Sequence, residues 1–183
     1  MPRPKSPVRL EWVEYHLKII GRLPFFKHLS AEAISKITAL FHDRDVHADE
    51  RIYFEGDNAD HLYLVAMGKV KLVCNTASGP EVFLDIILHG GDYFGALTAL
   101  GGRMYTETAI AQTEACILQI SSADFESILS EHPEVTRRAL EVVSQRLTES
   151  QEIVRQLSSY TSEQRIAAAL LRLAGRVLTV PAG

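Results

Sequence analysis

The sequence predicts an α+β fold in which short helices precede a block of antiparallel strands and a long helix follows it. Three observations support this prediction. From Arg44 onward, apolar residues come in short runs that glycine-rich turns separate, which is typical of strands. Helical spacing returns after Ser122, and from Pro133 the polar and apolar positions repeat in heptads. Neither glycine nor proline interrupts the heptads before Leu157.

The first 24 residues are expected to form a tail and a short helix. The start, MPRPKSPVRLEW, is charged and proline-rich and lacks the apolar core of a signal peptide. Apolar residues recur at helical spacing from Glu11 to Ile20, and Gly21 and Pro24 then break the pattern. Ser30 is expected to cap a second, amphipathic helix.

Residues 25–132 are predicted to contain about eight strands that form an antiparallel sandwich or barrel. The segments Val70–Cys74 and Val82–Leu88 flank a turn-rich TASGP and should pair as a hairpin. Two more strands are expected at 108–111 and 115–120, and Ser121-Ser122 should cap a short helix over 123–130.

Residues 133–161 are predicted to form a long dimerisation helix. Its a positions are Leu140, Leu147, Val154 and Thr161, and its d positions are Thr136, Val143, Ser150 and Leu157. A narrow seam of this kind favours pairing with a second copy over packing on its own domain. The predicted interface residues are Leu140, Val143, Leu147, Val154 and Leu157. Ser150 weakens one central layer.

Composition excludes several classes of protein. With 183 residues, 46% hydrophobic and 23% charged, the chain can bury a core. No apolar run approaches the ~18 residues of a membrane span. A net charge of −4 gives no overall footprint for nucleic acid. Two cysteines make no disulfide framework and suggest a reducing cytoplasm. We find no nucleophile, phosphate-loop or metal motif and expect no enzyme.

Three segments carry a resemblance to a known family: GDNADHLYLVAMG at 56–68, Gly91-Asp92-Tyr93-Phe94-Gly95, and RIAAALLRLAG at 165–175. Together they resemble the cyclic AMP receptor protein/FNR family of bacterial transcription regulators, over roughly residues 25–175. The resemblance implies a jelly-roll sensor barrel of the cyclic-nucleotide-binding type, a dimerising helix and a C-terminal domain that reads promoter DNA. Residues 162–183 would then be a hinge helix, capped by Ser162, and the start of a truncated DNA-binding domain.

The resemblance also implies a site for a small-molecule effector. The family's ribose-binding Gly-Glu-Leu turn corresponds to Gly95, Ala96 and Leu97, and its phosphate-binding Arg-Ser/Thr pair corresponds to Tyr105 and Thr106. Ala96 offers no carboxylate, and a tyrosine does not neutralise a phosphate as a guanidinium does. The effector is therefore expected not to be cyclic AMP.

Other positions complete the candidate ligand site. Arg103 is the candidate substitute for the missing guanidinium, and the long helix would contribute Arg146, Ser150 and Gln151. The turn with Arg146 is also similar to the family's cyanobacterial nitrogen regulator, which reads 2-oxoglutarate, although that relative has Glu where this chain has Gln151.

Two alternatives remain open. One is a haem-based sensor of CO or NO, with His16, His89 and Pro2 as candidate ligands. The turn residues Gly95 and Leu97 cannot bind iron, and ordinary surface histidines are the favoured interpretation of His16 and His89. The other is a member with no effector, which a pocket filled by Tyr105 would favour. Cys74 and Cys116 are expected to be buried apolar residues.

The expected mechanism is a population shift between two packings of the dimer. In this mechanism the effector contacts Arg146 or Ser150 and changes how the seams of the two long helices pack.

Overall fold

The computed structural model describes residues 9–74, 82–88, 91–95 and 104–159, together with 161, 163, 164, 167 and 170. The chain forms two compact units, Met1–Ala139 and Leu140–Gly183, which are described separately.

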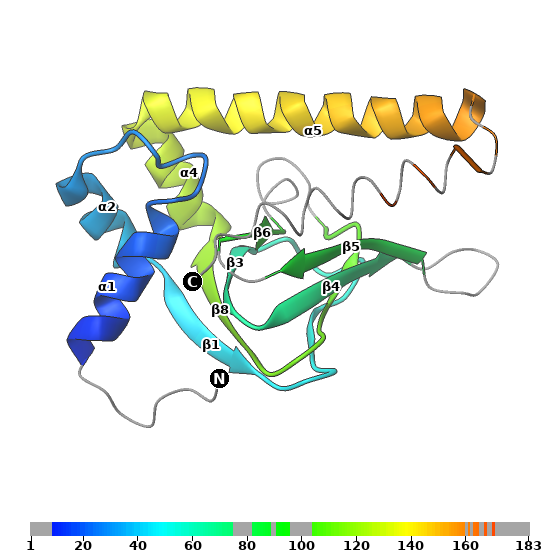
Figure 1. Ribbon diagram of the computed structural model, residues 1–183. Helices are drawn as coiled ribbons and strands as arrows, with labels where there is room; N and C mark the ends of the chain where they lie inside the picture. Colours follow the sequence, from blue (N-terminus) through cyan, green and yellow to red (C-terminus); the bar gives the residue numbers. More distant parts are fainter. Residues whose placement is uncertain are drawn as a thin grey trace. The chain divides into compact units, whose positions relative to one another are not determined.

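The first unit is built on two antiparallel four-stranded sheets (Figure 1). One sheet has the order β1-β8-β3-β6 and the other has the order β2-β7-β4-β5. The strands are β1 (His42–Val46), β2 (Arg51–Tyr53), β3 (His61–Met67), β4 (Lys69–Cys74), β5 (Val82–Leu88), β6 (Tyr93–Phe94), β7 (Thr108–Ala111) and β8 (Ala115–Ser121). Apart from β4 and β5, neighbours in the sheets are not consecutive in sequence, as in a jelly roll. The predicted α+β fold is confirmed, and so is the β4–β5 hairpin, in which Val70 pairs with Ile87.

Strand β3 is the centre of the core because it is buried on both faces. Tyr63 and Val65 point toward the second sheet and belong to the apolar cluster of the barrel interior. Since side chains alternate along a strand, Leu62 and Leu64 point the other way, and both are fully buried. This double burial explains why the run HLYLVAM is nearly continuous in apolar residues.

Three helices gather at one end of the barrel (Figure 1). They are α1 (Arg9–Ile20), α2 (Ala31–Thr38) and α4 (Ser122–Glu131). The predicted caps are confirmed: the Ser30 hydroxyl accepts from the Ala33 N–H at 3.2 Å, and the Ser121 hydroxyl accepts from the Asp124 N–H at 3.0 Å. The aromatic ring of Phe25 joins the helices to the sheet, since it packs edge-on against Tyr93 and Phe125.

Helix α5 (Pro133–Ser159) begins at the predicted proline and has 27 residues. In the first unit Val135 and Ala139 are buried, and the Thr136 hydroxyl donates to the Leu129 carbonyl at 2.6 Å. In the second unit Leu140, Leu147 and Val154 are 68%, 58% and 62% exposed.

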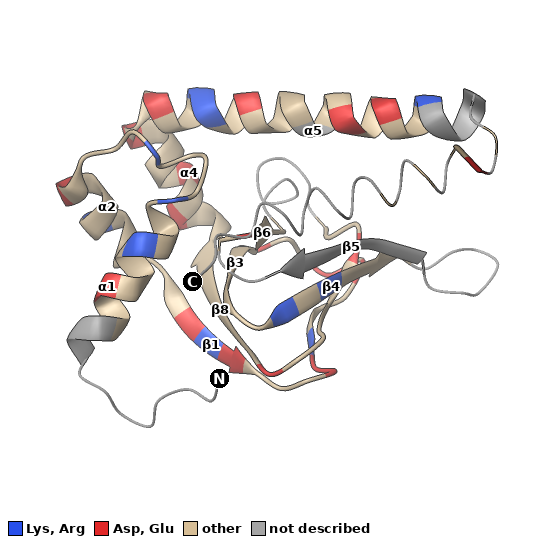
Figure 2. Cartoon of the chain, viewed as in Figure 1, with Lys and Arg blue, Asp and Glu red and all other residues tan. Residues whose placement is uncertain are grey.

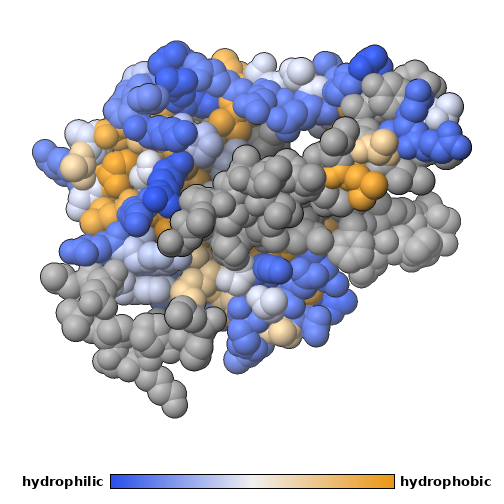
Figure 3. All heavy atoms as spheres, viewed as in Figure 1, coloured by the Kyte–Doolittle hydropathy of each residue, from blue (hydrophilic) through white to orange (hydrophobic). Residues whose placement is uncertain are grey.

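The surface of α5 mixes these apolar side chains with many charged ones. Figure 2 shows acidic and basic residues interspersed along the helix, and Figure 3 shows orange hydrophobic atoms among its blue hydrophilic ones. The unit boundary after Ala139 lies within α5, and the predicted domain division at residue 133 stays a prediction.

One turn between strands can be made only by glycine. Gly68 links β3 to β4 with φ +86°, and a Cβ there would lie 2.5 Å from the Glu114 carbonyl oxygen. Both the backbone angle and the close approach exclude a side chain.

The predicted hinge helix within residues 162–183 lies mostly outside the described residues. Within the described part of the chain, no helix combines the length and the apolar character that crossing a membrane requires.

Candidate functional site

The structure describes three of the six barrel residues predicted to contact an effector. These are Gly95, Tyr105 and Thr106. The predictions for Ala96, Leu97 and Arg103 lie outside the described residues. The geometry of the site is therefore built from Gly95, Tyr105, Thr106 and the strands around them.

Tyr105 is a buried residue whose hydroxyl, backbone N–H and carbonyl all form hydrogen bonds. Its side chain is in the barrel core, with the residue 3% exposed. Its hydroxyl donates to the His61 carbonyl at 2.9 Å and accepts from the His61 N–H at 3.0 Å. Its backbone N–H donates to the Asp57 carbonyl, and its carbonyl accepts from the Gly56 N–H, both at 2.9 Å. The position predicted to bind phosphate is thus joined to the first residue of β3 and to the turn between β2 and β3.

Four aromatic rings occupy the barrel interior at this position. Tyr105 stacks on Tyr53 with centroids 3.7 Å apart, and Tyr63 stacks on Phe94 at 5.1 Å. Tyr53 and Tyr63 are 5.5 Å apart, so the two pairs form one continuous group. We call Tyr53, Tyr63, Phe94 and Tyr105 the aromatic stack.

Gly95 is fitted to this stack. Its φ is +71°, and an added Cβ would lie 3.2 Å from ring atoms of both Tyr63 and Tyr105. The glycine of the predicted ribose turn therefore has a packing role in this chain, because a side chain would press on the rings.

Burial keeps the hydroxyls of the stack protonated. Desolvation raises the pKa of Tyr53 far above its ordinary value, and the negative charge of Glu107 raises it further. The Tyr53 hydroxyl donates to the Glu107 carboxylate at 2.8 Å. Desolvation also raises the pKa of Tyr105 strongly, with a further contribution from Tyr63. Both hydroxyls therefore act as hydrogen-bond donors.

Thr106 lies at the exposed rim of the site, beside a carboxylate. Its hydroxyl donates to Glu107 at 2.6 Å, and its carbonyl accepts from the Cys74 thiol at 3.1 Å. Desolvation and the charges of Glu55 and Glu107 raise the pKa of Cys74, so the thiol stays protonated. Cys116 is buried as predicted, whereas Cys74 is only partly buried. Because Glu107 bonds the Thr106 hydroxyl, a phosphate at Thr106 would face the carboxylate of Glu107.

The predicted effector contacts on the long helix belong to the second unit. Ser150 and Gln151 are exposed on α5. Arg146 lies in α5, and its side chain is outside the described residues. The role of these three residues at the site stays a prediction.

The haem candidates divide in the same way. His16 is only 8% exposed, so the prediction of a surface histidine is wrong there. The reason is the helical period of α1, which places His16 on the same face as the buried Ile19 and Ile20. His89 and Pro2 lie outside the described residues. No group of three or more potential metal ligands occurs in the described ranges.

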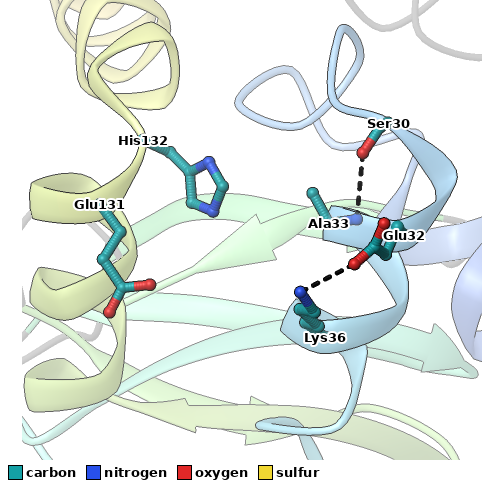
Figure 4. A pocket seen from close by; sticks show the side chains of 6 residues that line it. All are labelled: Ser30, Glu32, Ala33, Lys36, Glu131 and His132. Carbon is teal, nitrogen blue, oxygen red and sulfur yellow. Dashed lines mark hydrogen bonds and ion pairs between the residues drawn. The ribbon is translucent and has the colours of Figure 1, made fainter.

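A groove of about 350 Å³ lies between α2 and the end of α4 (Figure 4). Its walls are polar, but Ser30 is already used as a helix cap, and Lys36 pairs with Glu32 at 2.9 Å. His132 and Glu131 face them from the other wall. Of the residues predicted to bind an effector, those that the structure describes do not line this groove.

The fold is that of a cyclic nucleotide-binding domain, and the family of that description matches residues 43–132. The chain is 27% identical over 166 residues to the CRP-like cAMP-activated global transcriptional regulator of Mycobacterium tuberculosis, covering 91% of this chain and 74% of that protein. The crystal structure of the Thermus thermophilus catabolite activator protein superimposes with a TM-score of 0.69 at 27% identity, covering 84% of this chain and 71% of that one.

The matched domain and these similarities support membership of the cyclic AMP receptor protein/FNR family of bacterial transcription regulators. The global nitrogen regulator of Synechocystis is also similar, with 29% identity over 161 residues, 86% of this chain and 68% of that protein.

Sequence reasoning missed Tyr53, His61 and Glu107 as parts of the site. Their contacts join positions more than 40 residues apart, except for the Thr106–Glu107 bond. The only signal in the sequence was Tyr53 itself, an aromatic residue in one of the short apolar runs that follow Arg44.

Proposed function

We propose that this chain is the effector-sensing domain of a dimeric transcription regulator whose effector is not cyclic AMP. One observation carries the proposal: the position where the family places a phosphate-binding arginine holds Tyr105, which is buried and bonded to both polar backbone groups of His61. Regulators similar to this chain support the general function.

The argument against a cyclic phosphate is electrostatic. A buried or half-buried phosphate needs a positive partner, and the planar guanidinium of arginine meets this need with paired hydrogen bonds. The Tyr105 hydroxyl is neutral, and its donor and acceptor capacity is used by His61. The neighbouring Glu107 adds a negative charge at the rim. A phosphate bound here would lose its hydration without gaining a cation from the described residues.

Calorimetric titration of the purified domain with cyclic AMP tests this proposal. We expect no heat of binding up to ~1 mM ligand. A Kd of that size corresponds to a binding free energy of only about −4 kcal/mol. Saturable binding of one cyclic AMP per chain would overturn it. Native mass spectrometry of the same sample would show any small molecule that is retained from the cell.

The dicarboxylate 2-oxoglutarate is the next ligand to titrate, because the Synechocystis relative is a nitrogen regulator and the sequence offers Arg146 at the expected position. If it binds, the variant Arg146→Gln should lose binding. The matched control is Arg155→Gln, which removes an arginine of the same helix that already pairs with Glu152 at 2.7 Å. Equal loss in both variants would contradict a specific role for Arg146.

We propose that signalling runs through α5 and the seam that it presents to a second copy. Effector binding would favour one of two packings of the dimer, with Ser150 as the layer that can rearrange. The variant Ser150→Leu should fix one packing and remove the response to effector in the intact regulator. An unchanged response would disprove this mechanism.

A second candidate function, a regulator with no effector, is favoured by the aromatic stack. The rings of the stack contact one another in the region where the family binds its ligand, so the chain fills this region with its own side chains. A dimer of bare polypeptide mass that responds to none of the ligands above would favour this candidate. The alternative of a haem sensor is tested by the absorption spectrum of the purified protein, in which a Soret band would favour bound haem.

The setting proposed for this function is the cytoplasm, with promoter DNA as the partner of a C-terminal domain. No catalytic role is proposed, because the similar proteins reported above are regulators.

A further inference from the structure

We propose that His16 makes the docking of α1 on the barrel depend on pH, so that the helix is held at neutral pH and released on acidification. The inference goes beyond the proposed function and involves none of the residues of the effector site.

The geometry around His16 is that of a neutral imidazole in a buried interface. The side chain is buried on the same face of α1 as Ile19 and Ile20, and its Nε2 atom has no hydrogen-bond partner among the described residues. Its ring packs against Trp12 with centroids 4.8 Å apart and planes tilted by 60°. A charged imidazolium in this position would lose its hydration without gaining a hydrogen bond to a negative group, which is unfavourable.

The other polar anchor of α1 does not titrate with it. The Tyr15 hydroxyl donates to the Ala66 carbonyl at 2.7 Å, at the end of β3. Burial raises the pKa of Tyr15, and the negative form of Cys116 on β8 would raise it further, so this anchor stays protonated at and below neutral pH. Changes in docking below neutral pH therefore point to His16.

One charged group opposes this behaviour. Asp43 on β1 is the ionisable residue whose charge acts on His16 in the described part of the chain, and it raises the pKa of the imidazole. Burial is the larger influence and lowers the pKa, so the balance is a pKa below the ordinary value.

The sign of the pH dependence follows from linkage. In the undocked helix His16 is in water and has an ordinary pKa of about 6.5. In the docked helix its pKa is lower, so protons bind preferentially to the undocked form. Docking is then fully stable above the ordinary pKa and weakens as pH falls through it. The undocking equilibrium rises by up to about tenfold for each pH unit between the two pKa values.

The single tryptophan of the chain is a built-in reporter, because Trp12 lies against His16. We would measure Trp12 fluorescence and amide hydrogen exchange of α1, corrected for the intrinsic pH dependence of exchange, from pH 8 to pH 5. We expect a change in emission and faster exchange of α1 at the acid end, with the exchange of β3 unchanged.

Two variants separate His16 from the other histidines. His16→Gln should abolish both pH responses, since its amide does not titrate. His42→Gln, which alters an exposed histidine of β1, should keep them. A response that persists in His16→Gln, or that disappears in His42→Gln, overturns the proposal.

A measurement on the unchanged protein guards against a variant that fails to dock. NMR titration of the His16 imidazole should give a midpoint below the ordinary value, and a midpoint at or above it would refute the proposal even if both variants misfolded. Because effector binding plays no part in these readouts, their failure would leave the proposed function untouched.

Discussion

The Tyr105 hydroxyl forms hydrogen bonds with both the N–H and the carbonyl of His61, and this single group decides the chemistry of the candidate site. Because the Tyr105 hydroxyl already bonds the N–H and the carbonyl of His61, these two backbone groups are not available to a ligand. The residue is therefore a structural element of the barrel in addition to a predicted ligand contact.

Removing only this hydroxyl should be costly. The variant Tyr105→Phe keeps the ring stack and leaves the His61 backbone groups without their partner, which should lower the free energy of unfolding by about 1–2 kcal/mol. Urea denaturation measures the change. The control Thr106→Ala removes a hydroxyl from an exposed neighbour and should cost less than about 0.5 kcal/mol. Equal losses in the two variants would contradict the structural role of Tyr105.

The buried tyrosines should also make the domain sensitive to alkali. Tyr53 and Tyr105 have raised pKa values when folded, so the unfolded state gives up protons near pH 10 and the folded state does not. Stability is then present below the ordinary tyrosine pKa and lost as pH rises above it.

We expect the absorbance of these tyrosinates to appear together with unfolding, as monitored by far-UV circular dichroism. Full ionisation of all six tyrosines in a still-folded protein would be inconsistent with the buried stack.

At the scale of the structural elements, the turn between β3 and β4 leaves less room for a side chain than the other described glycine positions. Gly68 approaches the backbone of Glu114 and the side chain of Ala115 so closely that β3 and β8 could not keep their pairing with a larger residue.

The variant Gly68→Ala combines a left-handed backbone with a steric clash, and we expect it to cost roughly 2–5 kcal/mol. Gly56→Ala is the matched control, because Gly56 has nearly the same φ, +87°, with nothing within 4 Å of the added Cβ. It should cost only ~1–2 kcal/mol, the strain of the backbone alone. Thermal unfolding of the two variants measures the difference, and a Gly56 variant that is the less stable would contradict this explanation.

At this scale the sequence was informative. The caps of α2 and α4, the start of α5 at Pro133 and the β4–β5 hairpin could all be predicted, because each depends on residues close together in the chain. His16 could not be placed correctly, since a single polar residue on an apolar helical face is compatible with either a buried or an exposed position.

At the scale of the whole molecule, the exposed leucines of α5 motivate the predicted dimer. Leu140 and Leu147 are more than half exposed at two successive a positions of the heptad. Charged residues occupy much of the rest of the helix surface (Figure 2), which fits a narrow apolar seam between solvated flanks.

The variant Leu147→Glu should convert the dimer to a monomer, because the carboxylates of two copies would meet in the seam. Analytical ultracentrifugation measures the mass. Gln145→Glu adds the same charge to the same helix at an f position and should remain dimeric. Monomers in both variants, or dimers in both, would contradict pairing through this seam.

The site was less predictable than the fold. The motif positions Gly95, Tyr105 and Thr106 were predicted from local sequence and stay a prediction as ligand contacts, and the tyrosine in place of an arginine at 105 could be recognised there. The partners that decide what Tyr105 does, Tyr53 and His61, are brought to it by the sheets. Only the three-dimensional structure shows that its ring is stacked and its hydroxyl bonded.

The stacking of Tyr105 on Tyr53 also limits how the ligand preference of this chain can be changed, in evolution or in the laboratory. Replacing Tyr105 by arginine would place a charge against a buried ring and remove the partner of the His61 backbone, so the intermediate would be unstable. A useful change would have to alter Tyr53 and its hydrogen-bond partner Glu107 at the same time. A preference that needs several coordinated substitutions is hard to reach by single steps, so descendants of this chain are expected to retain it.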